Sequence, residues 1–165
     1  MRLSYGSKGG ETGLLTQIKE NAGSLRYGYT AFGELASMTQ SFTGGPKFTQ
    51  SYEYDNAGRI SAATLSGGQK ITYSYDEAGR LAGIDLNGRP ILTGMRYSAL
   101  EGITSARWGN GLPYKASYDA LGRVTSQTQG KKTVAYAYDK AGNITKQGNH
   151  TGQNTQIRVR LDIWV

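Results

Sequence analysis

Tyrosine and aspartate recur together at four places in the chain, three of them with an arginine, and the chemistry of these residues has to be judged first. Each place has the order Tyr-Asp, two variable residues, glycine, a polar residue and an aliphatic residue. A row of such carboxylates could bind a metal ion or act in acid–base catalysis. The candidate residues are Tyr54, Asp55, Gly58 and Arg59; Tyr75, Asp76, Gly79 and Arg80; Tyr118, Asp119, Gly122 and Arg123; and Tyr138, Asp139 and Gly142.

The spacing of these phrases indicates a repeat. Tyr54 and Tyr75 are 21 residues apart, and Tyr118 and Tyr138 are 20 apart. The gap of 43 residues between Tyr75 and Tyr118 holds a further copy at Tyr97, and another copy begins at Tyr29. We call these two worn copies, because each has lost the aspartate of the motif. A fixed order at a fixed period is typical of an array of identical structural units. The motif therefore has to be explained first as architecture.

A structural role accounts for the aspartates without any chemistry. Asp55-Asn56-Ala57-Gly58 matches a type I turn, with aspartate first and glycine fourth. The carboxylate then accepts from the backbone N–H two residues later, and glycine supplies the left-handed conformation of a turn followed by a bulge. Calcium binding would require more than one carboxylate in each loop. We expect capping aspartates, no catalytic residue, no metal site and no cofactor.

The other motif residues also have strand functions. In Tyr52-Glu53-Tyr54 the alternation of a strand puts both rings on one face, so stacked copies would form ladders of tyrosine. The arginines after the glycines could lie over rings of the adjacent copy or pair with its turn aspartate. The aliphatic residues that follow are expected to point to the core.

Other candidate functional residues are few. The chain has no cysteine and one histidine, His150, in a Gly/Asn loop, so a catalytic triad has no support. Trp108 is a candidate carbohydrate contact, with core or loop packing as the alternative. The net charge of +7 suggests an anionic partner, but the basic residues are scattered, which argues against nucleic acid. The N-terminus resembles no signal peptide, and no apolar run could span a membrane.

The pattern between the motif copies predicts an all-β fold of antiparallel hairpins. Short segments rich in Tyr, Thr, Ile and Val alternate with glycine turns, and Asn87-Gly88 is the most specific hairpin signal, between strands at 81–86 and 89–97. We expect one domain, residues 1–165, with about six repeats that are clearest in 50–145. Residues 146–165 are expected to form an atypical C-terminal hairpin, whose last strand alternates over 156–165.

These phrases resemble the YD repeats of the RHS family, found in bacterial polymorphic toxins, in the C component of Tc toxin complexes and in teneurins. The likeness covers about residues 13–145 and rests on Tyr54-Asp55, Tyr75-Asp76, Tyr118-Asp119 and Tyr138-Asp139. It implies a twisted, curved sheet of hairpins that forms part of a hollow shell enclosing a C-terminal toxin domain. The family's Asp-Pro cleavage motif is missing, and about six repeats are too few to close a shell.

The resemblance therefore favours a non-enzymatic structural module, with a carbohydrate-binding or cell-contact module using exposed Tyr and Trp as the alternative. The implied partners are other RHS repeats or a toxin domain of a parent protein. Secretion or display at a bacterial cell surface is implied in the same way. Because an open array leaves unpaired strand edges, edge-to-edge self-association is also expected.

Overall fold

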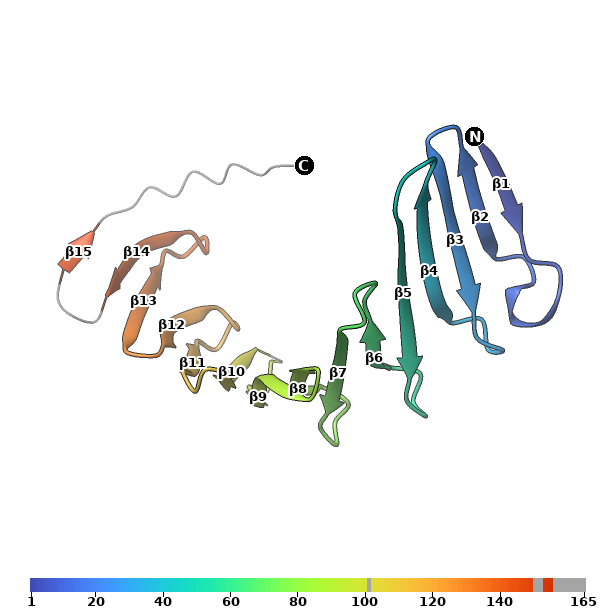
Figure 1. Ribbon diagram of the computed structural model, residues 1–165. Coiled ribbons are helices and arrows are strands. Elements are labelled where there is room, and N and C mark those ends of the chain that lie inside the picture. Colours follow the sequence, from blue (N-terminus) through green and yellow to red (C-terminus); the bar gives the residue numbers. More distant parts are fainter. Residues whose placement is uncertain (101, 150–152, 156–165) are drawn as a thin grey trace. The chain divides into compact units, whose positions relative to one another are not determined.

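The chain folds into antiparallel β-hairpins, as a computed structural model shows for residues 1–100, 102–149 and 153–155 (Figure 1). Strand order is chain order from β1 to β15. In the described residues the one regular helix is a short 3₁₀ turn, Gly9–Glu11. The predicted fold class, an all-β array of antiparallel hairpins, is confirmed.

Two compact units divide the chain. The first comprises Met1–Ser74 and Ile84–Arg89, and the second Tyr75–Gly83 and Pro90–Val165. The sequence predicts no boundary, since no linker interrupts the repeats, and the division falls within the hairpin made by β8 (Leu81–Leu86) and β9 (Arg89–Tyr97). That residues 1–165 form a single array stays a prediction.

In the first unit each strand pairs with the strand that follows it in the chain. These strands form the hairpins that the sequence predicts between glycine turns, and β1 precedes the first of the repeats. The strands of this unit are β1 (Arg2–Tyr5), β2 (Leu15–Glu20), β3 (Gly23–Tyr29), β4 (Leu35–Phe42), β5 (Lys47–Tyr54), β6 (Ile60–Thr64) and β7 (Lys70–Tyr75).

The second unit continues the same pattern. Most of the predicted C-terminal hairpin, including the strand at 156–165, lies outside the described residues. The further strands here are β10 (Ile103–Trp108), β11 (Pro113–Tyr118), β12 (Val124–Gln129), β13 (Lys132–Tyr138), β14 (Ile144–Asn149) and β15 (Gln153–Thr155).

The turn at Asn87-Gly88 has the conformation that its sequence predicts. Asn87 has φ 51° and Gly88 has φ 74°, so both central residues are left-handed, as a type I′ turn requires. Asn87 is the one described residue other than glycine with positive φ. The side-chain amide oxygen of Asn87 also accepts from the backbone N–H of Lys70 at 2.8 Å, which secures this turn against β7.

The alternation of the strands sorts side chains onto two different faces. Tyr27 pairs with Met38 and Met38 with Gln50, which places larger side chains on one face of the first unit. Thr39 and Thr49 pair on the opposite face, where their hydroxyl oxygens lie 3.1 Å apart. The tyrosine-bearing face is therefore the more apolar of the two.

Within each unit the described strands form a single layer without a conventional core. The buried hydrophobic residues in the described part are Ala62, Ala63, Met95, Ala106 and Ala116, and no large side chain is fully buried. Contrary to the expectation that the aliphatic residue after each turn points to a core, Ile144 is 44% exposed. The physical reason is that, among the described residues of each unit taken by itself, no second layer packs on the strands, so strand pairing and contacts between copies have to stabilise them.

Candidate functional site

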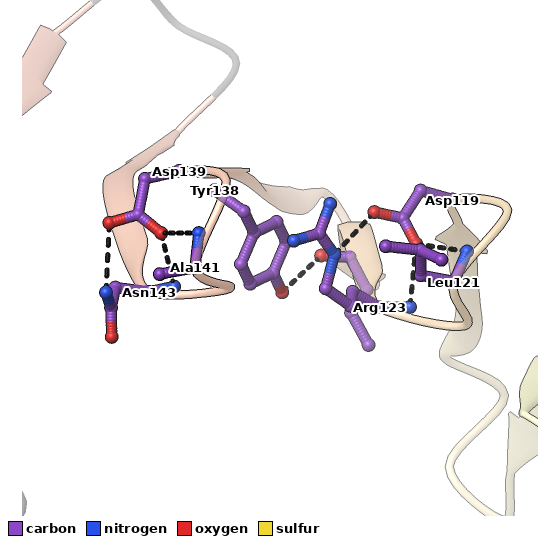
Figure 2. Close-up of polar contacts among 8 residues, drawn as sticks. Asp119, Leu121, Arg123, Tyr138, Asp139, Ala141 and Asn143 are labelled. Atoms are coloured by element: carbon purple, nitrogen blue, oxygen red, sulfur yellow. Dashed lines mark hydrogen bonds and ion pairs between the residues drawn. The ribbon is translucent and has the colours of Figure 1, made fainter.

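Each turn aspartate binds its own turn, and the copy at Asp119 shows how (Figure 2). One carboxylate oxygen, Oδ1, accepts from the backbone N–H of Leu121 at 3.0 Å and from that of Arg123 at 2.9 Å. The other oxygen, Oδ2, accepts from Nε of Arg123 at 2.7 Å. Both oxygens of this carboxylate are thus occupied within a segment of five residues.

The same arrangement recurs in the other intact copies. Oδ1 of Asp55 accepts from the backbone of Ala57 and Arg59, and Oδ2 lies 2.7 Å from both Nε and Nη2 of Arg59. Oδ1 of Asp76 accepts from the backbone N–H of Arg80 at 2.8 Å. In the last copy Asn143 replaces arginine, and its side-chain Nδ2 donates to Oδ2 of Asp139 at 2.9 Å.

These hydrogen bonds lower the pKa of all four aspartates. For Asp55 and Asp139 the largest cause is a hydrogen bond from a side chain, that of Arg59 and of Asn143 respectively. For Asp76 and Asp119 it is a hydrogen bond from a backbone N–H, that of Arg80 and of Arg123 respectively. A carboxylate with a lowered pKa is a poor acid or base near neutral pH. In the described residues no group of three His, Cys, Asp or Glu is placed to bind a metal ion.

The lowered pKa values predict a loss of stability in acid. A group with a lower pKa in the folded state contributes its stability above its unfolded pKa, near 3.8, and loses it as the pH falls through the folded pKa. We therefore expect the urea midpoint to fall between about pH 5 and about pH 3. At about pH 5 the Asp119→Asn/Asp139→Asn variant should have a lower urea midpoint than the unchanged chain. Its midpoint should then fall less than that of the unchanged chain as the pH is lowered to about 3.

The control for this experiment is Glu20→Gln/Glu77→Gln, which removes the same charge from side chains that make no hydrogen bond within the described residues. This variant should keep the acid dependence of the unchanged chain. An unchanged acid dependence in the aspartate variant would show that the turn carboxylates do not stabilise the fold.

Arginine and tyrosine connect each turn to the next copy. The guanidinium of Arg123 lies 4.5 Å from the ring centre of Tyr138 (Figure 2). That of Arg80 lies 4.8 Å from the ring centre of Tyr97. The sequence left open whether arginine contacts a ring or an aspartate. In these two copies arginine lies over a ring of the following copy, as one alternative predicted, but the aspartate that it binds is that of its own turn and not that of the adjacent copy.

The tyrosine hydroxyl adds a contact that sequence reasoning missed. The second tyrosine of a copy donates to the backbone carbonyl of the aliphatic residue that begins a strand of the preceding copy, as Tyr138 does to Val124 at 2.8 Å. No local pattern could reveal this acceptor, because donor and acceptor lie 14 to 19 residues apart. Further pairs of this kind are Tyr29 with Leu15, Tyr54 with Leu35, Tyr97 with Leu81 and Tyr118 with Ile103.

The worn copy at Tyr97 keeps this architecture with different residues. Ser98 takes the place of aspartate, and its hydroxyl accepts from the backbone N–H of Gly102 at 3.1 Å. Gly102 therefore stands in the place that arginine has in the intact copies. A Cβ there would lie 2.5 Å from Cζ of Tyr118, so the absence of a side chain lets this ring pack directly on the backbone.

Trp108, the candidate carbohydrate contact, begins a turn of the same kind. Its backbone N–H donates to the carbonyl of Leu112 at 2.9 Å, and its indole Nε1 is buried without a hydrogen-bond partner in the described residues. The ring is half-buried and lines a cavity of about 450 Å³. Pro90, Ile91, Gly109, Asn110 and Gln129 complete the lining. His150 lies outside the described residues.

The fold and the motif contacts together define a class of protein, an open array of β-hairpins in which each copy is tied to the next. Two segments, residues 54–89 and 118–152, match the RHS repeat family. These two segments are thus similar to RHS repeats, and the shared fold supports an RHS/YD-repeat assignment. No curated protein sequence matches it.

Solved structures of Tc toxins share the fold. In the Photorhabdus luminescens Tc holotoxin pore, the match has a TM-score of 0.79 at 21% identity and covers 90% of this chain and 9% of the other. For TcdB2-TccC3-Cdc42 the TM-score is 0.80 at 21% identity, over 90% of this chain and 9% of that one. The chain thus spans about a tenth of the length of these proteins. In its described part, no helix has the length and apolar character needed to cross a bilayer.

Proposed function

We propose that the chain forms part of the wall of an RHS shell that encloses a toxin polypeptide, and that it has no catalytic role. The observation that carries this proposal is the use of the motif side chains. The motif carboxylates, guanidiniums and hydroxyls form hydrogen bonds within the turns and between copies, as at Asp119, Arg123 and Tyr138.

The single layer of the sheet also suits a wall. A hairpin array without a core gains stability when further copies continue it, because each copy buries its tyrosine against the preceding one. The partners that we propose are therefore other RHS repeats of a longer protein and the polypeptide that they enclose. In the described residues β1 pairs with β2 alone, and the expected edge-to-edge self-association of the isolated chain stays a prediction.

A graft tests the wall function directly. Residues 13–145 would replace the structurally matching repeats of TccC3, and proteinase K digestion of its hypervariable C-terminal region would be followed in complex with TcdB2. We expect the region to remain protected, because the grafted hairpins continue the wall. In the matched control, a graft with Tyr118→Ala and Tyr138→Ala should lose protection. A folded graft that leaves the region as sensitive as when it is free would contradict the proposal.

Carbohydrate binding at Trp108 is a second candidate, which the cavity beside this ring favours. Asn110 and Gln129 bring side-chain amides to the cavity, next to an aromatic ring. Screening on a glycan array compares the unchanged chain with Trp108→Ala. Binding that is lost in the variant supports this function, and the absence of any bound glycan would eliminate it.

A further inference from the structure

The turn at Thr30–Glu34 differs from the intact copies in charge. Thr30 takes the place of aspartate, and its hydroxyl oxygen accepts from the backbone N–H of Phe32 and from that of Glu34, each at 3.2 Å. Glu34 takes the place of arginine. The shape of the turn is thus kept, while a negative side chain stands where Arg80 and Arg123 stand in the intact copies.

The ring that should receive an arginine here is that of Tyr54. Its hydroxyl donates to the carbonyl of Leu35 at 2.8 Å, just as the hydroxyl of Tyr97 donates to Leu81. Arg80 covers the ring of Tyr97, but Glu34 is the residue beside Tyr54. Burial raises the pKa of the Tyr54 hydroxyl, and the charge of Glu34 raises it further. The π face of a ring attracts a cation, not a carboxylate.

The missing arginine leaves a space. A cavity of about 580 Å³ lies between this turn and the turn at Asp55, and its walls include Phe32, Glu34, Tyr52 and Tyr54. In the copy at Tyr97, by contrast, the ring of Tyr118 packs onto Gly102 and occupies the place of the arginine. Of these two copies without arginine, the one at Glu34 is therefore the one that has an open and negatively charged site.

The cavity contains charge without a counterion. Oε2 of Glu34 accepts from the Thr30 hydroxyl at 3.0 Å, and the structure shows no ion pair for Glu34 in the described residues. Phe32 is 91% exposed and provides a second ring at the mouth. A carboxylate surrounded by aromatic rings suits a planar cation, which can hydrogen-bond to the oxygen and stack on a ring.

We propose that this cavity binds the side chain of an arginine from a polypeptide partner. The intact copies show the same chemistry within the chain, where a guanidinium bonds to a carboxylate and lies over a tyrosine at Arg80 and Arg123. At the Glu34 copy the cavity already contains the carboxylate of Glu34 and the ring of Tyr54. The guanidinium would be supplied by the partner. This inference does not depend on the wall function.

Titration of the full chain with N-acetylarginine amide, followed by NMR, tests the inference. We expect saturable shifts confined to residues 30–35 and 52–58. Glu34→Gln should weaken binding about fivefold or more, because it removes a charge-assisted hydrogen bond. The neutral analogue N-acetylcitrulline amide should bind more weakly by a similar factor, and Glu77→Gln, in an exposed position of an intact turn, should bind as the unchanged chain does.

A rebuilt copy gives a second measurement. Thr30→Asp/Glu34→Arg restores the intact pair, so it should abolish binding and raise the melting temperature together. A merely damaged site would not gain stability. No saturable binding of the arginine amide, equal binding of the citrulline amide, or unchanged affinity in Glu34→Gln would each overturn the proposal.

Discussion

Replacing Gly102 with alanine is expected to lower the free energy of unfolding by about 1–3 kcal/mol, as overpacking in a close contact does. The new Cβ would meet the Tyr118 ring at 2.5 Å. This ring cannot retreat freely, because its hydroxyl donates to the carbonyl of Ile103 at 2.9 Å. Urea denaturation followed by circular dichroism measures the loss.

The control is the same substitution in a Tyr118→Leu background. Leucine lacks the far end of the ring, so alanine at position 102 should cost much less there. An equal cost in both backgrounds would contradict the direct packing of the ring on the glycine and would point instead to the backbone conformation of the turn.

Removing the Tyr138 ring is expected to have an effect of similar size. Tyr138→Ala should lower the free energy of unfolding by about 2–4 kcal/mol, because the half-buried ring lies under the Arg123 guanidinium. Tyr138→Phe should cost only about 1 kcal/mol, since it removes the hydrogen bond to Val124 and keeps the ring.

Tyr5 provides the matched control. It lies on β1 and is 60% exposed, so Tyr5→Ala should change the free energy of unfolding by less than about 0.5 kcal/mol. If Tyr138→Ala and Tyr5→Ala had the same small effect, tyrosine contacts between copies would not stabilise the sheet. Guanidinium chloride denaturation of all three variants allows the comparison.

The hairpins could be predicted from the sequence because their signals are local. Turn glycines and alternation are contained within one copy, so the strands predicted at 81–86 and 89–97 match β8 and β9. Strand β1 was missed because Arg2–Tyr5 contains only part of a motif and pairs with residues beyond the turn helix. The closing strand at 156–165 lies outside the described residues and stays a prediction.

The contacts between copies could not be predicted in the same way. Whether arginine would meet a ring or a carboxylate depends on how two successive hairpins lie against each other, and the sequence of one copy does not determine this. The places of Gly102 and Glu34 illustrate the point. In the sequence both residues are simply departures from the repeat motif. In the structure, the ring of Tyr118 packs on the backbone of Gly102, whereas Glu34 lines a cavity.

The site residues named from the sequence are thus distributed among separate turns. Asp119 and Asp139, for example, each bind the backbone of their own turn, and Arg123 connects one copy to the next. Their function in this account is to hold the array together. From the sequence, the tyrosines were expected to act through their rings alone. Their hydroxyls also help to hold the array together, because they donate hydrogen bonds to backbone carbonyls of preceding strands.

A double-mutant cycle between Arg123 and Tyr138 tests most directly whether the motif ties successive copies together. The cycle compares Arg123→Gln, Tyr138→Leu and the double variant by urea denaturation. We predict a coupling energy of about 0.5–1 kcal/mol, as for a cation over an exposed ring. The parallel cycle of Arg123 with Tyr97, whose ring is covered by Arg80, should be additive. Additivity in the Arg123–Tyr138 cycle would contradict the account.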